Sequence, residues 1–318
     1  MSTVTDSLAG EYGALTERCG LVDRSERGKL ALTGAEAREF LHGQVSNDIE
    51  ALEPGQGCYA AFLTPKGKML GDLRVLNLGG ELFLDTERIS LQALFNMIRS
   101  YKLGRDVELH KRTVERGLLS LVGPGARAAA GADAERLGPA EHDNAAGEIG
   151  GVPVRLVATA AGVDLICDAE RTDDLKAALA GVPEVSEAAA EVMRVESGRP
   201  RYGLDLDESV IPQEAALNER AVSFTKGCYV GQETVARLYY RGKPNRHLRG
   251  LRLSAPAVTG DALRLGERAV GRLGSSVVSP AHGPIGLAIV RREAAPGDTV
   301  AVGDSGVTAT LVELPFQE

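Results

Sequence analysis

Cysteine is scarce in this sequence, and its placement excludes several kinds of site. The 318 residues include four cysteines and no tryptophan. The cysteines show neither CxxC nor metal-type spacing, so we expect no structural metal site. A chain of this length can bury a sizeable core without a disulfide framework. The four are Cys19, Cys58, Cys167 and Cys228, of which Cys167 lies in an apolar strand pattern and Cys228 alone lies among polar residues and glycines.

Long apolar runs and an excess of basic residues are also missing. No stretch is apolar over the roughly 20 residues that a membrane-spanning helix needs, so we expect no membrane partner. The formal net charge is −8, whereas nonspecific nucleic-acid binders are usually basic, and a nucleic-acid partner is therefore not expected. The first residues, MSTVTDSLAGEYG, lack the basic and apolar regions of a signal peptide. They favour a cytoplasmic protein with a disordered segment at 1–12.

Glycine-rich phosphate loops are absent as well, because neither GxGxxG nor GxxxxGK followed by Ser or Thr occurs after a strand. Before residue 200, predicted strands and helices are mixed, for example a strand meander over 58–85 and a helix over 87–101. This order is typical of an α+β fold and not of a doubly wound sheet. From residue 246, short apolar strands separated by Gly, Pro and Asp turns indicate a small β-barrel or sandwich.

A capping box is predicted before the first amphipathic pattern. In TGAE, Thr33 is placed to cap a helix and Glu36 to reach back to it. The apolar residues that follow have helical spacing, so we expect a helix from here to about Gln44. The next residues, VSNDI, predict a turn because Asn and Asp suit non-helical backbone.

The stretch KGCYVGQE, residues 226–233, combines a thiol with residues that permit unusual backbone geometry. The apolar spacing after it predicts a helix that begins near Gly231. Cys228 would precede this helix, and Lys226 is two residues away; the helix dipole and the ammonium group both lower the pKa of a nearby thiol. The residues alone leave three interpretations open: a turn with a small buried cysteine, a reactive thiol, or one ligand of a metal or cluster. A single cysteine cannot complete a structural metal site.

KGCYVGQE fills every defined position of the signature KGCYxGQE, so the chain resembles the YgfZ-type folate-binding proteins. These are relatives of the glycine-cleavage T-protein that act in iron–sulfur protein maintenance. Further segments agree, namely FLHGQVSNDI, YAAFLTPKGKMLGDL, RVESGRPRYGLDLDE, IPQEAALN and IGLAIV, and the resemblance is weakest at 124–150. It implies a three-lobed, T-protein-like α+β fold around a central folate channel. Two interleaved lobes would occupy 13–245 and a C-terminal β-barrel 246–318.

The resemblance also implies a site for tetrahydrofolate or a folate derivative. Glu196 occupies the position of the T-protein glutamate that binds the pterin ring, and a carboxylate can accept two parallel hydrogen bonds from an aminopyrimidone edge. Arg241 and Arg246 could pair with the glutamate tail of folate. The other candidate cofactor-binding residues are Gln44, Asn47, Asp48, Tyr59, Phe62, Lys66 and Gln232. For several of them the alternative role is local capping, core packing or a plain hairpin position.

One departure from the T-protein pattern bears on the reaction. The T-proteins carry an acidic pair after the glycine turn, whereas here Gly71 precedes the single Asp72. We therefore expect Cys228, with Lys226 and Asp72, to act in a folate-dependent accessory protein for iron–sulfur cluster assembly or repair. Its partners would be iron–sulfur client or assembly proteins, and a transient iron–sulfur cluster could form at Cys228. The alternatives are a folate-dependent aminomethyltransferase or demethylase and a thiol redox protein with vestigial folate binding.

Overall fold

The computed structural model describes the backbone of residues 2–317 and the side chains of residues 7–317, and the chain divides into two units. The first unit contains Met1–Leu63, Leu70–Ala190 and Arg220–Val230. The second contains Thr64–Met69, Glu191–Glu219 and Gly231–Glu318. The predicted domains 13–245 and 246–318 are contiguous ranges, whereas each unit combines segments that are distant in sequence.

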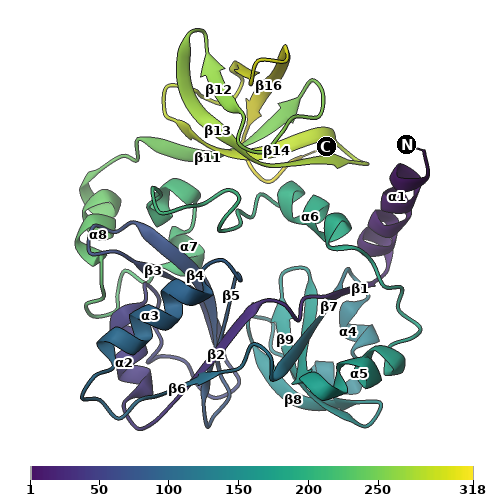
Figure 1. Ribbon diagram of the computed structural model, residues 1–318, viewed down its shortest axis with the longest axis vertical. Coiled ribbons are helices and arrows are strands. Elements are labelled where there is room, and N and C mark those ends of the chain that lie inside the picture. Colours follow the sequence, from purple (N-terminus) through teal and green to yellow (C-terminus); the bar gives the residue numbers. More distant parts are fainter. Residues whose placement is uncertain (1, 318) are drawn as a thin grey trace. The chain divides into compact units, whose positions relative to one another are not determined.

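Two five-stranded sheets make up most of the first unit (Figure 1). One has the strand order β3-β4-β5-β2-β6 and the other the order β1-β7-β10-β9-β8. The strands are β1 (Gly20–Asp23), β2 (Gly28–Thr33), β3 (Gly57–Leu63), β4 (Met69–Asn77), β5 (Leu82–Thr86), β6 (Glu108–Lys111), β7 (Arg116–Val122), β8 (Asn144–Ile149), β9 (Val152–Thr159) and β10 (Gly162–Asp168). Because β1 joins one sheet and β2 the other, the N-terminal segment contributes to both.

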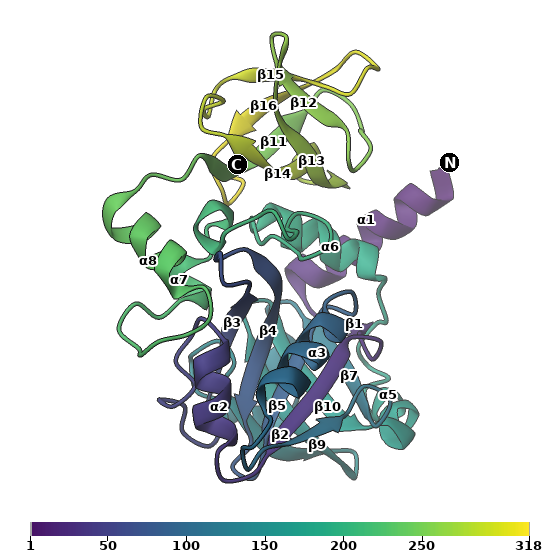
Figure 2. The ribbon, with the colours of Figure 1, turned by 60° about the vertical axis from the view of Figure 1, so that its left-hand side comes forward.

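Helices α2 and α3 cover one face of the first sheet (Figure 2). Phe40 of α2 and Leu94 and Ile98 of α3 pack in one buried cluster with Leu30 of β2. The helices are α1 (Ser2–Glu17), α2 (Ala37–Gln44), α3 (Leu91–Tyr101), α4 (Ala126–Ala129), α5 (Thr172–Ala178), α6 (Glu187–Glu196), α7 (Asn218–Ala221) and α8 (Gln232–Arg241), with short 3-10 helices at Ala132–Arg136, Ala169–Arg171 and Pro212–Ala215. The predicted helix over 87–101 is present as α3, which begins four residues later than predicted.

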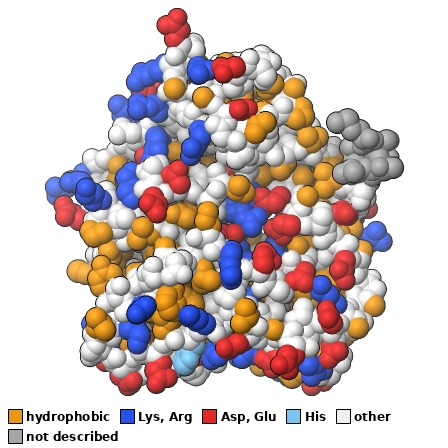
Figure 3. All heavy atoms as spheres, in the orientation of Figure 1, with side chains coloured by type: hydrophobic (Ala, Val, Ile, Leu, Met, Phe, Trp, Pro, Cys, Tyr) orange, Lys and Arg blue, Asp and Glu red, His pale blue; other side chains and the backbone are white. Residues whose placement is uncertain are grey.

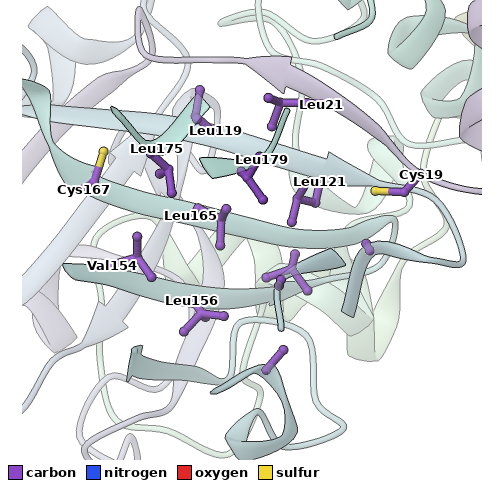
Figure 4. Packing of buried hydrophobic residues seen from close by; sticks show 14 of the residues in the cluster. Cys19, Leu21, Leu119, Leu121, Val154, Leu156, Leu165, Cys167, Leu175 and Leu179 are labelled. Carbon is purple, nitrogen blue, oxygen red and sulfur yellow. The ribbon is translucent and has the colours of Figure 1, made fainter. Parts of the chain in front are cut away.

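The second sheet of this unit has its own apolar core (Figure 4). Leu119 of β7 and Leu165 of β10 pack in one buried cluster with Leu175 of α5. Cys167 is 2% exposed in this cluster, which confirms its predicted place in the core.

A buried ion pair joins the two sheets. Arg74 of β4 contacts Asp85 of β5 and reaches Asp164 of β10 with an Nη1–Oδ2 distance of 2.5 Å. The carboxylate of Asp85 is fully buried, and two arginines, Arg27 and Arg74, lower its pKa to about 2 against the effect of burial. The first unit therefore has a charged interior between its sheets, in which each of these buried charges has a partner.

Helix α1 occupies the segment that was predicted to be disordered. Leu15 is fully buried, and the Glu11 carboxylate accepts a hydrogen bond from the backbone N–H of Ser186 at 2.9 Å. The structure thus has helix where a disordered segment was expected over residues 2–12, and Met1 lies outside the described residues. Sequence patterns could not predict these contacts, because Ser186 lies 175 positions away from Glu11.

The predicted capping box is wrong. Thr33 is the last residue of β2, and its hydroxyl lies 2.8 Å from Nε2 of His110. Glu36 makes no side-chain cap and instead accepts a hydrogen bond from the backbone N–H of Asp106 at 2.6 Å. Both residues that would have capped the helix thus bind partners in the segment 106–110 instead. The predicted end of this helix near Gln44 is confirmed.

The second unit contains a closed barrel with the strand order β11-β14-β13-β12-β15-β16. Its strands are β11 (Arg246–Leu253), β12 (Ala262–Leu265), β13 (Arg268–Ser279), β14 (Gly283–Arg291), β15 (Thr299–Val302) and β16 (Val307–Val312). Leu251, Leu273, Val290 and Leu311 are at most 1% exposed inside it. The predicted C-terminal β-barrel is confirmed.

The surface carries charges of both signs. Figure 3 shows Lys and Arg side chains interspersed with Asp and Glu side chains over the face that it displays. The net charge of −8 is therefore not gathered into one acidic surface there. None of the helices within residues 2–317 has the length and apolar character that crossing a membrane would require.

Candidate functional site

The segment 226–233 contains two buried residues with exposed residues between them. Lys226 is 8% exposed and Tyr229 7% exposed, whereas Cys228 between them is an exposed, free thiol. The backbone N–H of Val230 donates to the carbonyl of Gly43 at 3.3 Å. The segment is thus fixed on both sides of a cysteine that faces outward.

Lys226 ties this segment to the end of α2. Its Nζ donates hydrogen bonds to the carbonyl oxygens of His42, of Val45 at 2.8 Å and of Asn47 at 3.0 Å. It also lies 5.1 Å from the centroid of the Tyr229 ring. Burial lowers the pKa of Lys226 to about 8, so the ammonium form predominates at neutral pH. An ammonium group has three donors, and these carbonyls use all three, which argues against the predicted role of Lys226 beside the thiol.

The helix predicted after Cys228 is present. Helix α8 begins at Gln232, and Gly231 before it has a left-handed φ of 86°, which glycine adopts without strain. Cys228 precedes Gln232 by four positions, and the effect of a helix dipole falls off within the first turn. Among the described residues, none makes a hydrogen bond to the Cys228 sulfur. Cys228 therefore stands out because its thiol is exposed, and not because it lies at a helix terminus.

The other cysteines are less accessible. Cys19 and Cys167 are buried, and burial raises the pKa of both thiols. Cys58 in β3 is partly exposed as a residue, but burial of its thiol raises the pKa to about 12, although Lys226 acts in the opposite direction. Within residues 2–317, Cys228 is therefore the one exposed thiol.

Tyr59 and Asp72 form a buried pair in the first unit. The Tyr59 hydroxyl donates to Oδ2 of Asp72 at 2.6 Å, and the guanidinium of Arg220 lies 5.0 Å from the centroid of the Tyr59 ring. Burial raises the pKa of Asp72 to about 6, although the hydrogen bond from Tyr59 lowers it. Burial and the neighbouring carboxylate raise the pKa of Tyr59 well above its ordinary value. A carboxyl group with a pKa near 6 can take up and release a proton close to neutral pH, as a general acid or base must.

Phe62 lies in the core of the first sheet. Its side chain is fully buried in the cluster that contains Leu30 and Leu94. A Cβ on Gly71 would lie 2.5 Å from the Phe62 ring, so the glycine allows the ring to pack directly on β4. The structure favours core packing of Phe62 over the predicted contact with a ligand.

The polar residues after α2 differ in what they bind. Asn47 donates to the carbonyls of Tyr59 at 2.8 Å and Arg220 at 3.3 Å, and its own oxygen accepts from the N–H of Asp48. Asp48 in turn accepts from a backbone N–H three residues on. These contacts build the turn. By contrast, the amide oxygen of Gln44 is buried and accepts no hydrogen bond from any described residue. Of the three candidates, Gln44 offers an acceptor to a ligand.

Lys66 lies at an exposed hairpin position. The turn between β3 and β4 is closed by hydrogen bonds of 2.8 Å from the N–H of Thr64 to the carbonyl of Lys68 and from the N–H of Gly67 to the carbonyl of Thr64. Lys66 makes no hydrogen bond or ion pair with the rest of residues 2–317. The hairpin turn alone accounts for Lys66 in the stretch TPKGK, and no contact with a ligand is needed to explain it.

Glu196, at the end of α6, belongs to the second unit, and its carboxylate is held in place by Ser279. The Ser279 hydroxyl donates to Oε1 of Glu196 and accepts from the N–H groups of Ala281 at 3.0 Å and His282 at 2.9 Å. Ser279 is 1% exposed, so this hydroxyl has a fixed orientation. A carboxylate offers about four acceptor sites, and the Ser279 hydroxyl fixes the orientation in which Glu196 presents them.

The candidate residues near α8 have different surroundings. Arg246 forms a bidentate pair with Glu214, with N–O distances of 2.8 and 3.1 Å, and donates to the carbonyl of Ser209 at 2.6 Å. This pairing leaves Arg246 poorly suited to hold a folate tail. Arg241 is exposed at the last position of α8, and Gln232 is half-buried at the first.

Two buried amide oxygens of the second unit were missed in the sequence. Gln213 Oε1 and Asn218 Oδ1 accept no hydrogen bond from the described residues. Ala216 between them has a left-handed φ of 57°, which is uncommon for a residue other than glycine. Buried acceptors in native proteins nearly always have a donor, so we expect a water molecule or a ligand to donate a hydrogen bond to each of these oxygens. Both residues lie in IPQEAALN, but neutral amides give no chemical signal in a sequence.

His142 of the first unit was also missed. It is 7% exposed, its backbone has a left-handed φ of 76°, and its Nδ1 has no partner within the described chain. Burial lowers the pKa of His142 to about 4, so the imidazole is neutral at physiological pH. The residue lies in 124–150, where the resemblance is weakest, and no motif could have revealed it.

A search for similar families and proteins gave consistent matches. The family model described as the GCVT N-terminal domain matches residues 1–226. A chloroplastic protein of Arabidopsis thaliana, provisionally named a transferase, is 28% identical over 307 residues, which cover 93% of this chain and 71% of the relative. An aminomethyltransferase of Streptomyces coelicolor is 29% identical over 329 residues, which cover 96% of this chain and 88% of the relative.

A solved structure has the same fold. The glycine cleavage system aminomethyltransferase T from Bartonella henselae matches with a TM-score of 0.86 and 24% sequence identity, covering 97% of this chain and 89% of that chain. The predicted α+β, T-protein-like fold is thereby confirmed.

Proposed function

Because the chain belongs to the GCVT N-terminal domain family, we propose that it binds tetrahydrofolate or a folate derivative and assists iron–sulfur cluster assembly or repair. In this proposal it is a protein of the YgfZ type, and Cys228 is its working thiol. The observation that carries the proposal is the exposure of Cys228 between the buried residues Lys226 and Tyr229. A thiol in a plain structural turn would more often be buried with its neighbours.

Acceptor oxygens support folate as the ligand. The aminopyrimidone edge of a pterin presents N–H donors, and the second unit offers the Glu196 carboxylate and the buried oxygens of Gln213 and Asn218. Such groups fit a donor-rich heterocycle better than an anion. The central channel that the resemblance implies remains a prediction.

The chemistry proposed for Cys228 is that of a single exposed ligand or nucleophile. Within residues 2–317, no group of three or more His, Cys, Asp or Glu side chains is placed to hold a metal ion. A cluster would therefore be cargo, bound through the Cys228 thiolate and completed by groups of a client or assembly protein. The partners in this proposal are such iron–sulfur proteins.

Two substitutions test the two parts of the proposal. Glu196→Ala should weaken tetrahydrofolate binding in calorimetry by about ten- to a hundredfold, because a charge-assisted hydrogen bond contributes roughly 1.5–3 kcal/mol. Glu208→Ala, which removes an exposed carboxylate of the same unit, is the matched control. Cys228→Ala should keep folate affinity within about twofold but fail to restore iron–sulfur enzyme activity in cells that lack the protein. Unchanged folate affinity in the Glu196 variant, or full restoration by the Cys228 variant, would contradict the proposal.

A second candidate function, folate-dependent aminomethyl transfer or demethylation, is favoured by the pair of Tyr59 and Asp72. A buried carboxyl with a pKa of about 6 suits proton transfer beside a folate nitrogen. The test is a transfer assay with the purified protein, tetrahydrofolate and an aminomethyl donor. Under this function Asp72→Asn should lower the rate by about 10²–10⁴-fold, the usual contribution of a general acid or base, while Cys228→Ala leaves it unchanged. Absence of any transfer by the unaltered protein would exclude it.

A further inference from the structure

A groove between α3 and β6 of the first unit takes no part in the proposed function. It has a volume of about 560 Å³. Its lining contains four basic residues, two apolar ones, one histidine and one glutamate, and we call it the basic groove: Phe95, Arg99, Lys102, Leu109, His110, Lys111, Arg112 and Glu115.

The alternation of β6 builds the floor of the basic groove. Leu109 packs against the core cluster that contains α3, and Nζ of Lys111 lies 5.0 Å from the centroid of the Phe95 ring. His110 between them belongs to the opposite face, where its Nε2 lies 2.8 Å from the Thr33 hydroxyl. An apolar floor of Phe95 and Leu109 is therefore bordered by cationic side chains.

The cations of the basic groove are unequally paired. Arg112 binds the carboxylates of Glu115 at 2.7 Å and Glu81 at 3.2 Å, and Lys102 donates to the carbonyl just before β6 at 3.0 Å. Arg99 and Lys111 are exposed, and neither has a carboxylate partner among the side chains of residues 7–317. The positive charge of the groove is therefore left uncompensated at these two positions.

The basic groove adjoins an open sheet edge. In the order β3-β4-β5-β2-β6, strand β6 comes last and pairs with β2 alone. Backbone N–H and C=O groups on the open side of an edge strand can pair with an added strand. The groove thus has a backbone template beside its charged and apolar side chains.

Three large apolar side chains that lie close to the groove residues in the sequence are exposed. Ile89 is 68% exposed, Leu103 83% and Val114 84%. Figure 3 shows hydrophobic and basic side chains gathered side by side over the region where Figure 1 shows α3. Residues 87–116 contain seven Lys or Arg and four Asp or Glu, a net charge of +3 in a chain of −8. Exposed apolar side chains grouped in this way mark interaction surfaces.

We propose that the basic groove binds an acidic, partly apolar segment of another protein, laid along the open edge of β6. Acidic side chains of the segment would pair with Arg99 and Lys111, and its apolar side chains would cover Phe95 and Leu109. A second copy in two-fold contact through this surface would place two basic grooves against each other, so charge complementarity favours the acidic segment. A nucleic acid fits less well, because Lys111 already covers the Phe95 ring on which a base would stack. The proposal does not depend on folate binding.

The test uses the full chain and a fluorescein-labelled ten-residue peptide of alternating Glu and Leu. The exposed pair Arg99→Glu/Lys111→Glu should weaken binding of this peptide at least tenfold in fluorescence anisotropy. The control Arg291→Glu/Arg292→Glu changes the same charge at exposed positions of the barrel unit and should change affinity less than twofold. Bound peptide should also slow hydrogen exchange of the β6 amides. Circular dichroism and thermal melting confirm that both variants are folded.

Several results would overturn the proposal. The peptide could fail to bind the unaltered chain at about 1 mM, or the two double variants could lose affinity equally. A peptide with Lys in place of Glu could bind equally well, which would remove the role of charge. A single-stranded oligonucleotide that competes more tightly for the groove would assign it to nucleic acid. Sedimentation that shows a dimer abolished by the Arg99 and Lys111 changes would assign it to a second copy.

Discussion

The hydroxyl of Tyr59 lies 2.6 Å from Oδ2 of Asp72 and donates a hydrogen bond to it. The bond stabilises the charged form of a carboxyl that is 5% exposed, while burial stabilises the neutral form. Burial prevails, and the pKa of Asp72 is about 6 instead of 3.8. The charge on Asp72 therefore changes in a pH range where few carboxyl groups titrate.

Asp72 should make the stability of the protein fall as pH rises. Between pH 3.8 and about 6 the folded chain binds more protons at Asp72 than the unfolded chain, so its contribution to the free energy of unfolding decreases over this range. The total decrease is about 3 kcal/mol, from roughly 1.4 kcal/mol per pKa unit. Asp72→Asn lacks this titration, and urea unfolding from pH 4 to pH 7 should show the variant gaining about this much relative to the unaltered protein. Parallel pH profiles for the two proteins would disprove the assignment.

Removal of the Tyr59 hydroxyl should move this titration. Tyr59→Phe takes away the donor that lowers the pKa of Asp72, so the pKa should rise above about 6. A carboxyl-carbon NMR titration of the two proteins measures the shift, with Asp72→Asn used to assign the signal. A pKa that falls or stays constant in Tyr59→Phe would show that the hydrogen bond does not stabilise the charged form.

Cys228 should react with iodoacetamide before the other three cysteines. At pH 8 a thiol with a pKa of about 12, such as Cys58, is about 10⁻⁴ thiolate, and the thiolate is the reacting species. Cys19 and Cys167 are buried. Peptide mapping by mass spectrometry after short labelling should find the label on Cys228 at least tenfold more often than elsewhere. In urea all four should be labelled, and comparable native labelling of Cys58 would contradict the structure.

Lys226→Met should destabilise the protein, because three carbonyl oxygens lose a charged donor. Hydrogen bonds to charged groups contribute about 1.5–3 kcal/mol each and are not additive, so a loss of about 3 kcal/mol in urea unfolding is expected. Lys66→Met, at an exposed turn, is the matched control and should stay within about 0.5 kcal/mol. Equal effects of the two substitutions would mean that the contacts of Lys226 contribute little.

Gly71→Ala should be destabilising for steric reasons. The added Cβ would lie 2.5 Å from the Phe62 ring and 2.6 Å from Ser90, and overpacking of a core typically costs about 1–3 kcal/mol. Gly80→Ala is the control, because a Cβ there meets nothing within 4 Å. Thermal unfolding of both variants gives the comparison. A melting temperature of Gly71→Ala that matches the control would show that the core can yield.

Local patterns were enough to predict several elements. The helical spacing after Gly231 predicted α8, and the short apolar strands after residue 246 predicted the barrel, because each signal lies within the element itself. The TGAE pattern failed since Thr33 finds its partner, His110, on another strand. A local rule cannot detect a competing contact that is distant in sequence.

The candidate site shows the same limit. The sequence placed Lys226 beside Cys228, but it could not show that carbonyls from residues 42–47 take up all the donors of this lysine. It likewise could not distinguish Phe62 as a ligand wall from Phe62 as core. Gln213 and Asn218 became candidates only when the fold buried their oxygens without donors.

The residues that anchor the segment around Cys228 are not the residue that carries the thiol. Lys226 and Tyr229 are buried and keep this segment in place, whereas the Cys228 sulfur makes no hydrogen bond with any described residue. Metallation, persulfidation or oxidation of that sulfur would leave every anchoring contact intact. If Cys228 is the working thiol of the proposed function, each round of loading and release would therefore leave the fold of this segment unchanged.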